Sequence, residues 1–277
     1  MIQLGKFSTL KAYRYKEQGM YLEDDHEDEV LLPNKYVPDG LDIGDEIEVF
    51  VYTDSEDRLI ATTEKPKIVV GEFAYLEVVQ VTKFGAFLDW GLEKNLLVPF
   101  SQQKRNMEEG EWHVVYLYCD EISDRLVASA KWHKFVDAKE ISVKDGEEVD
   151  LLIAHPTDLG WNVIINNLHA GLIYNNEIFQ PIHTGDRLKG YIKQVRPDNK
   201  IDVSLEQQGF VRIEPNAQKI LEILKKEKGF LNLTDKSDPE LIKRRLSMSK
   251  KTFKKAIGTL YKQRLVRLEK DGTYLVG

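Results

Sequence analysis

The side chains in this sequence that could do chemistry are aromatic and basic residues grouped around a glycine in a strand-like segment. Lys83, Phe84 and Phe87 lie on either side of Gly85, and Lys94 follows shortly afterwards. Exposed rings stack on unpaired bases while cationic groups follow the phosphate backbone, so such a group can hold single-stranded RNA. The alternative is that both rings pack against a neighbouring part of the same chain.

A second aromatic and basic group comprises Tyr174, Tyr191, Lys193 and Arg196. Tyr191 and Lys193 are two positions apart, and alternation along a strand places them on the same face. This group therefore satisfies the same requirement for stacking and positive charge. The alternative is that these are ordinary solvated residues of a strand.

A third group consists of lysines in a segment with helical periodicity. Phe253, Ile257 and Leu260 recur with the spacing of one helical face. The lysines that oppose this face are Lys250, Lys251, Lys254, Lys255 and Lys262. Lysines neutralise phosphates without reading bases, so they predict nucleic-acid contact of low sequence specificity. The alternatives are a solvated helix face and docking onto acidic parts of the same chain.

The sequence lacks the patterns of catalytic and metal sites. The six histidines show no metal-ligand spacing, and the single cysteine, Cys119, has no paired ligand. The acidic run 24–29 lacks the glycine and spacing of an EF-hand loop, which favours a solvated charge run. Neither a glycine-rich phosphate loop nor a Gly-x-Ser-x-Gly elbow is present. We therefore expect no enzyme activity, no metal and no cofactor.

The aromatic groups belong to a repeat that recurs three times along the chain. In each copy a glycine is followed 13 residues later by an apolar residue, 12 later by another glycine, and 14 or 15 later by a basic residue. The sets are Gly19, Leu32, Gly44 and Arg58; Gly85, Val98, Gly110 and Arg125; and Gly160, Ile173, Gly185 and Lys200. The copies start 66 and then 75 residues apart, which suits a small self-contained barrel and is too long for a solenoid unit.

Each copy contains short segments rich in β-branched and aromatic residues, separated by turn residues at intervals of about ten. Roughly five such strands per copy predict an all-β, five-stranded barrel. In the second copy, alternation places Ala86, Leu88 and Trp90 inside the barrel and leaves Phe87 and Asp89 outside.

This second copy resembles the RNA-binding domain of ribosomal protein S1. The glycine, small residue, phenylalanine and leucine at 85–88, followed by the apolar strand 96–99, carry the resemblance. It implies an oligonucleotide-binding (OB) barrel that contacts RNA through its outward aromatic residues.

The other two copies depart from the S1 pattern. In the first copy, Gln18 stands where Phe84 would be, and the acidic run fills the following loop. The third copy places Asn162 at the outward position but has Tyr174 at the end of its next strand. We therefore expect RNA contact from the second and third copies rather than from the first.

The pattern changes after residue 210 from alternation to helical periodicity. A helix is predicted from about Asn216 until Gly229 ends it, and Asp238 before a proline predicts the start of a second. Ser249 caps a third helix, and the turn at 271–272 predicts a closing β-hairpin. Three helices followed by a hairpin make a winged helix-turn-helix domain.

Charge is distributed unevenly between these parts. Residues 211–277 hold 17 Lys and Arg against 8 Asp and Glu, a balance of +9, whereas residues 1–210 hold 22 against 38, a balance of −16. The two parts are thus expected to meet different partners or each other, and the basic end is a candidate for nucleic acid. One cysteine, no apolar run of membrane-spanning length and no leader-like N-terminus predict a soluble, cytoplasmic protein.

Three barrels followed by a basic winged helix resemble a bacterial family, conserved virulence factor B. The stretches 234–239 and 248–262 carry its most recognisable signature. The resemblance implies an RNA-binding regulatory protein without known catalysis. The predicted domains are 1–64, an acidic and divergent S1-like OB barrel; 65–136, an S1 RNA-binding barrel; 137–210, an S1-like OB barrel; and 211–277, a winged-helix domain.

We therefore expect a mostly β protein with a small α+β end that binds single-stranded RNA and controls gene expression after transcription. One alternative is a scaffold that binds protein partners such as ribosomal or transcription components. Another is a DNA-binding transcriptional regulator, which would need a dimer with regularly spaced half-sites. No membrane partner is expected.

Overall fold

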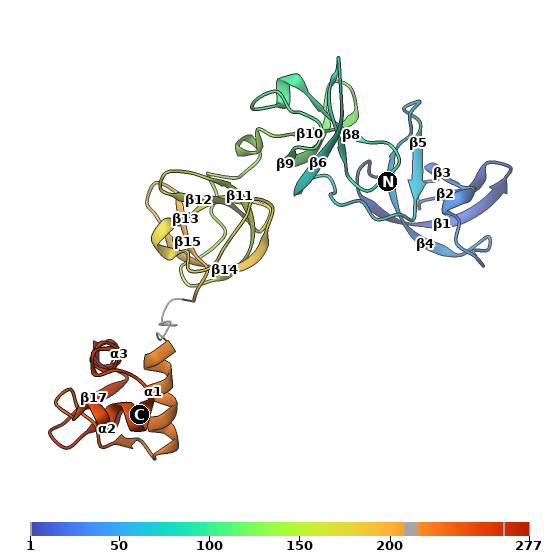
Figure 1. Ribbon diagram of the computed structural model, residues 1–277. Helices are drawn as coiled ribbons and strands as arrows, with labels where there is room; N and C mark the ends of the chain where they lie inside the picture. Colours follow the sequence, from blue (N-terminus) through green and yellow to red (C-terminus); the bar gives the residue numbers. More distant parts are fainter. Residues whose placement is uncertain (1, 208–214, 263, 277) are drawn as a thin grey trace. The chain divides into compact units, whose positions relative to one another are not determined.

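The computed structural model describes residues 2–207, 215–262 and 264–276 (Figure 1). Contacts within the chain divide it into two compact units, Met1–Gln207 and Gln208–Gly277. In the described residues, every α-helix belongs to the second unit. The four domain boundaries expected from the sequence are finer than this division and stay a prediction.

The first unit contains two closed five-stranded barrels of the same topology. The first barrel consists of β1 (Phe7–Lys16), β2 (Gly19–Glu23), β3 (Glu29–Pro33), β4 (Glu46–Thr53) and β5 (Leu59–Thr62), in the order β1-β2-β3-β5-β4. The third barrel consists of β11 (Glu148–Pro156), β12 (Gly160–Ile165), β13 (His169–Tyr174), β14 (Arg187–Val195) and β15 (Ile201–Ser204), in the corresponding order. Parallel pairing of the third strand with the fifth closes each barrel, at Leu31 with Ile60 and at Gly171 with Ile201.

Between them lies the middle module, which has the same strand order without the closing ladder. Its strands are β6 (Phe73–Thr82), β7 (Gly85–Asp89), β8 (Leu96–Pro99), β9 (Trp112–Asp120) and β10 (Arg125–Ser129), in a five-stranded sheet of order β10-β9-β6-β7-β8. The buried amide of Gln103 donates to the carbonyl of Val98 at 3.0 Å, and the N–H of Ala130 donates to the carbonyl of Gln102 at 3.0 Å. The backbone carbonyl of Val98 and the backbone N–H of Ala130 thus form hydrogen bonds with the connection after β8 instead of with the opposite edge strand. The prediction of a mostly β fold with closed five-stranded barrels is confirmed for the first and third copies, whereas the middle copy has the five strands without a hydrogen-bonded ladder between β8 and β10.

The first glycine of each repeat sits where the second strand crosses close to the third. Gly19, Gly85 and Gly160 have φ values of 149°, 146° and 158°. A Cβ at these positions would lie 2.1, 2.3 and 1.9 Å from the carbonyl oxygen of the apolar residue that follows 13 positions later. These apolar residues are Leu32, Val98 and Ile173. The spacing in the sequence therefore records a backbone contact too close for any side chain.

The backbone N–H of the second glycine of each repeat forms a hydrogen bond with the first strand at a β-bulge. The N–H groups of Gly44, Gly110 and Gly185 donate to strand carbonyls at 2.7, 2.8 and 2.8 Å. The acceptors are Ala12, Val78 and Ile153, each at a shift in strand register. All three copies therefore bend their first strand in the same way.

Apolar side chains join the middle module to both of its neighbours. Phe50 and Tyr52 of β4 pack against Trp90, which follows β7, within one core cluster. On the other side, Phe73 of β6 belongs to a cluster with Leu152 of β11. The modules of the first unit thus share cores.

The second unit is a winged-helix domain, as the sequence predicts. Its elements are α1 (Pro215–Lys226), β16 (Phe230–Leu231), α2 (Pro239–Leu246), α3 (Lys250–Lys262), β17 (Val266–Leu268) and β18 (Thr273–Leu275) (Figure 1). Asp238 caps α2 by accepting hydrogen bonds from the backbone of its first turn. Phe253, Ile257 and Leu260 of α3 are buried in the core of the unit, which confirms the predicted apolar stripe.

Candidate nucleic-acid interface

Two predicted aromatic residues lie at and beside the turn between β6 and β7. The side chain of Phe84 is 63 % exposed, and Nζ of Lys83 lies 5.1 Å from the centroid of its ring. Phe87 is partly buried on β7, whereas its neighbours Ala86 and Leu88 are buried in the core. The predicted alternation along this strand is therefore confirmed.

Phe84 and Phe87 line a cavity of about 350 Å³, which we call the β7 cavity. The middle module also contributes Lys94 and Arg125 to its walls, and the first barrel contributes the turn between β4 and β5. A ring on which a base can stack thus lies beside cations that can meet its phosphate. In the sequence, Arg125 stands out only as the basic residue of the second repeat.

Both cations of the β7 cavity pair with one carboxylate of the first barrel. Nζ of Lys94 lies 3.2 Å from Oδ1 of Asp57, and Nη2 of Arg125 contacts Oδ2 of the same residue. Lys94 also donates to Oγ1 of Thr53 at 3.2 Å and to the carbonyl of Asp54 at 2.6 Å. Lys94 therefore contacts a neighbouring module, the first barrel. Such contact was the alternative stated for the two rings of this group.

A tight turn holds the carboxylate of Asp57 in this position. Oδ1 of Asp54 accepts hydrogen bonds from the backbone of Glu56 at 2.9 Å and of Arg58 at 3.0 Å, and Nε of Arg58 donates to Oδ2 at 2.8 Å. Burial acts to raise the pKa of Asp54, but the hydrogen bonds from Arg58 and Glu56 outweigh it and lower that pKa. The ionised Asp54 carboxylate thereby fixes the turn in which Asp57 adopts a φ of 61°.

The floor of the β7 cavity is anchored in the shared core. Nε1 of Trp90 donates to the carbonyl of Lys94 at 2.6 Å, which fixes the backbone of that lysine. The indole meets Phe50 and Tyr52 edge-on, with ring centroids 5.7 and 6.3 Å apart. Burial raises the pKa of Tyr52, so its hydroxyl stays neutral at physiological pH. The cavity is therefore backed by packed aromatic rings, whereas Phe84 at its lining is exposed to solvent.

In the third barrel, Tyr174 and Arg196 line a cavity of about 400 Å³. Asp202 holds the guanidinium with two contacts of 2.9 Å, from Nε to Oδ2 and from Nη2 to Oδ1. Cζ of Arg196 lies 5.8 Å from the centroid of the Tyr174 ring, and Nη2 contacts its hydroxyl oxygen. Hydrogen bonds to Asp202 and Tyr174 raise the pKa of Arg196. This cavity therefore offers a ring, but a cation that is already paired.

The other two residues of the predicted third-barrel group lie apart from that cavity. The hydroxyl of Tyr191 donates to Oε2 of Glu148 at 2.9 Å, and Nζ of Lys193 lies 2.5 Å from Oε1 of Glu177. Neither residue lines the cavity of Tyr174 and Arg196. Alternation along the strand predicts that Tyr191 and Lys193 share a face. It gives no sign of the acidic residues from other segments that bind them.

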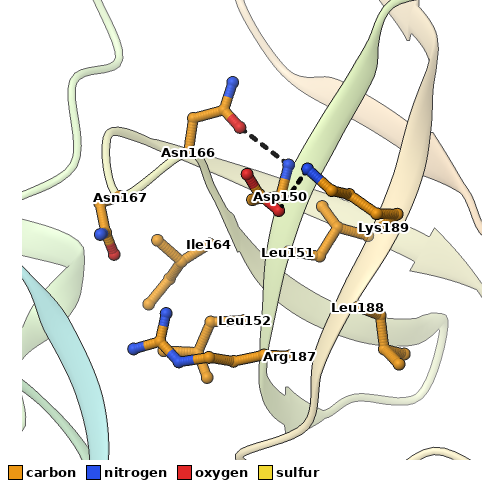
Figure 2. Close-up of a pocket in the computed structure, with 9 residues that line it drawn as sticks. All are labelled: Asp150, Leu151, Leu152, Ile164, Asn166, Asn167, Arg187, Leu188 and Lys189. Atoms are coloured by element: carbon orange, nitrogen blue, oxygen red, sulfur yellow. Dashed lines mark hydrogen bonds and ion pairs between the residues drawn. The ribbon is translucent and has the colours of Figure 1, made fainter. Parts of the chain in front are cut away.

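A larger hollow of about 540 Å³ lies beside β11, β12 and β14 (Figure 2). Its charges are internally satisfied: Nζ of Lys189 lies 2.7 Å from Oδ1 of Asp150, and the backbone of Asp150 donates to the side chain of Asn166 at 2.9 Å. Nη2 of Arg187 donates to the carbonyl of Phe73 in the middle module at 2.7 Å. The nine residues that line this hollow include no aromatic ring, so it offers no base-stacking surface.

The lysines predicted on α3 lie on its exposed side. Lys251, Lys254, Lys255 and Lys262 are exposed, and Lys250 is partly buried. One of them has a distant acidic neighbour, since Nζ of Lys254 lies 3.9 Å from Oδ2 of Asp235. The last turn of α2 adds further cations, which sequence reasoning did not single out although they close a helix. They are Lys243, Arg244 and Arg245.

The described residues contain no group of three or more His, Cys, Asp and Glu side chains that could hold a metal ion. In the acidic run, Oδ1 of Asp24 accepts hydrogen bonds from the backbone of His26 and Asp28 at 2.8 and 3.1 Å. Burial raises the pKa of the Cys119 thiol, the reverse of a reactive cysteine. Among the residues that the structure describes, no helix is long and apolar enough to cross a membrane.

Comparison with known proteins places these features in a family. Residues 4–64 and 70–131 match the S1 domain, and residues 218–275 match the CvfB-like winged helix domain. Conserved virulence factor B of Staphylococcus saprophyticus is 27 % identical over 239 residues, which span 83 % of this chain and 80 % of that protein. A Bacillus subtilis protein called uncharacterized protein YitL is 30 % identical over 279 residues, which span 98 % of this chain and 93 % of that protein. The chain belongs to the conserved virulence factor B family.

The family of conserved virulence factor B also includes a Staphylococcus epidermidis protein that is 24 % identical over 96 % of this chain and 92 % of its own length. A solved structure of a multidomain protein with nucleic acid binding domains from Streptococcus pneumoniae is 24 % identical, with a TM-score of 0.44 over 99 % of this chain and 98 % of that one. The predicted family, its S1 domains and its winged helix are confirmed. The S1 match includes the acidic first barrel despite its departures from the pattern.

Proposed function

We propose that this protein binds single-stranded RNA with little sequence preference and controls gene expression after transcription, without a catalytic step of its own. The observation that carries the proposal is the β7 cavity, where Phe84 and Phe87 lie beside Lys94 and Arg125. The match to S1 and winged-helix domains supports it, because OB barrels and helix-turn-helix domains are recurrent nucleic-acid binders.

Stacking on the two rings gives only weak binding by itself. A base stacked on an aromatic side chain contributes about 1–3 kcal/mol, so two rings supply about 2–6 kcal/mol. That sum corresponds to dissociation constants from tens of micromolar upwards. Useful affinity therefore requires phosphate contacts in addition to the rings.

Phosphate contacts at the β7 cavity require an exchange of partners. Lys94 and Arg125 are paired with Asp57, and these side chains are more than a third exposed. Exposed ion pairs contribute about 0–1 kcal/mol each, so an incoming phosphate can replace the carboxylate at small cost. The first barrel would then regulate the charge of the binding face rather than bind RNA itself.

The winged-helix domain would add cationic contact through the exposed lysines of α3. Each phosphate that a lysine neutralises releases counterions and steepens the salt dependence of binding. Lysines position a backbone but do not read bases, which fits binding without an operator sequence. Tyr174 and Arg196 of the third barrel would add a weaker contact, because Asp202 already neutralises that guanidinium.

Two double variants test the proposal in binding titrations with poly-pyrimidine and poly-purine RNA at low salt. Phe84→Ala with Phe87→Ala should weaken binding by about tenfold per ring that stacks a base. Lys254→Ala with Lys255→Ala should weaken binding mainly at low salt. Phe100→Ala is the matched control, since Phe100 is an exposed ring of the same module outside the β7 cavity. If neither double variant binds more weakly than the control, the proposal is wrong.

The engagement of Lys94 and Arg125 by Asp57 favours one alternative, a protein-interaction scaffold. A face whose cations are already paired leaves its apolar rings as the main free contact, which suits a protein partner. Capture of partners that persists after nuclease treatment and is lost with Phe84→Ala would favour this function over RNA binding.

A further inference from the structure

A fourth cavity, of about 440 Å³, lies between the middle module and the third barrel. Its lining includes Lys104, Trp112 and Trp132 of the middle module and His155 of β11, and we call it the histidine cavity. Its volume lies within the range of small-molecule sites, about 300–1,000 Å³. No residue of the β7 cavity lines it.

Lys104, which lines the histidine cavity, makes a direct contact with His133, which is not itself one of the lining residues. Nζ of Lys104 lies 3.2 Å from Nε2 of His133. An ammonium group has only donors, so this ring nitrogen accepts and the imidazole is neutral. Trp132 supports both groups: the His133 ring lies 3.6 Å from it between centroids, and Nζ of Lys104 lies 5.2 Å from its centroid.

His155 completes the group from the third barrel. Its Nε2 lies 3.0 Å from Nδ2 of Asn162, so it also accepts and is neutral. The rings of His133 and His155 meet edge-on with centroids 5.7 Å apart. One lysine and two imidazoles are thus gathered at the junction of two modules.

This group has no counter-charge of its own. No carboxylate in the described residues forms an ion pair with Lys104, and the nearby Glu111 is taken by Arg105 at 2.7 Å and by His113 at 3.0 Å. Partial desolvation lowers the pKa of Lys104, although the residue as a whole is exposed. Burial, together with Lys104 and His155, lowers the pKa of His133 to about 4. An anion bound in the cavity would favour the positively charged forms of Lys104, His133 and His155, which are disfavoured in its absence.

We propose that the histidine cavity binds a nucleotide through its terminal phosphate monoester, with the phosphate at Lys104, His133 and His155 and the base beside Trp112. Trp112 is 44 % exposed, and its centroid lies 5.4 Å from that of the Tyr75 ring, so one side is supported. A phosphate monoester carries close to two negative charges at neutral pH, and its oxygens accept hydrogen bonds from an ammonium group. Indole is a strong stacking surface for a base.

A nucleotide with a terminal phosphate monoester occurs in two forms, a free mononucleotide and the phosphorylated 5′ end of a nucleic-acid strand. The inference does not rest on RNA binding at the β7 cavity. The double variant Phe84→Ala with Phe87→Ala is accordingly expected to retain the site, so failure of one proposal leaves the other standing.

The test is titration of the full-length protein with adenosine 5′-monophosphate, followed by calorimetry and by the imidazole NMR signals of His133 and His155. We expect both signals to shift, and adenosine, which lacks the phosphate, to bind at least about tenfold more weakly. Lys104→Met should weaken binding by a similar factor. The matched control, Lys134→Met, removes an exposed lysine from the adjacent turn Trp132–Lys134 and should change affinity less than about twofold.

The source of the phosphate is separated by a second titration with oligonucleotides that carry either a 5′-phosphate or a 5′-hydroxyl. Tighter binding of the phosphorylated strand, lost in Lys104→Met, identifies a strand end, whereas binding of the mononucleotide alone identifies a free nucleotide. Unchanged imidazole signals at millimolar nucleotide, or equal binding by wild type and Lys104→Met, would overturn the proposal. Inorganic phosphate that binds as tightly as the nucleotide would refute the role of Trp112.

Discussion

Replacing Asp57 with asparagine should increase the affinity of this protein for single-stranded RNA. The carboxylate of Asp57 pairs with both Lys94 and Arg125 at the β7 cavity, so an RNA phosphate has to displace it. The asparagine side chain is isosteric with aspartate but uncharged, and asparagine tolerates the φ of 61° that this position requires. The Asp57→Asn variant therefore frees two cations with little change to the turn that holds them.

The size of this effect follows from the exposure of the two ion pairs. Exposed pairs are worth about 0–1 kcal/mol each, so loss of both competitors should raise RNA affinity by up to about 2 kcal/mol, or up to about thirtyfold. Two additional phosphate contacts should also steepen the salt dependence, by about 1.4 in the slope of log affinity against log salt for a single strand. The stability of the first unit should fall by no more than about the same 2 kcal/mol.

The assay is fluorescence anisotropy with a labelled pyrimidine oligonucleotide at several salt concentrations. The matched control is Asp39→Asn, which removes one negative charge from an exposed loop of the first barrel away from the β7 cavity. If Asp57→Asn binds RNA no more tightly than Asp39→Asn while remaining folded, Lys94 and Arg125 do not meet RNA phosphate. If both variants gain equally, the effect is one of net charge alone.

Further predictions concern stability and salt dependence. Gly85→Ala should destabilise the first unit by several kcal/mol in denaturant unfolding, because its Cβ would lie 2.3 Å from a carbonyl oxygen, whereas Gly110→Ala faces open space and should cost about 1 kcal/mol. Because the pKa of His133 is lowered to about 4, its contribution to stability is present above about pH 6.5 and is lost as the pH falls towards 4; His133→Gln should flatten thermal midpoints measured across that window. Lys254→Ala with Lys255→Ala should reduce the salt slope of RNA binding by about 1.4, and an unchanged slope would place RNA away from α3.

The repeated fold could be predicted from the sequence because each landmark records a local backbone requirement. The spacing between Gly85 and Val98 is set by one close approach of neighbouring strands, which recurs in every copy. The alternation around Phe87 follows from the geometry of a single strand. Such features depend on residues close in sequence, so they are visible without the structure.

The parts that escaped prediction depend on partners distant in sequence. The side chain of Gln103 satisfies a strand edge that barrel closure would otherwise have paired, which no periodicity reveals. Asp57 neutralises Arg125 from 68 residues away, and Glu148 meets Tyr191 from the neighbouring strand. Pairing with acidic residues from other segments of the chain therefore neutralises several of the predicted cations, although the repeat position of Arg125 was a usable signal.

The aromatic contact of Phe50 and Tyr52 with Trp90 has a consequence for the cooperativity of unfolding in the first unit. Because the first barrel supplies side chains to the core of the middle module, neither can be excised or exchanged without exposing buried rings to water. The two copies should therefore unfold in a single cooperative transition. The acidic first barrel thus contributes to the fold of the middle module, independently of any RNA contact of its own.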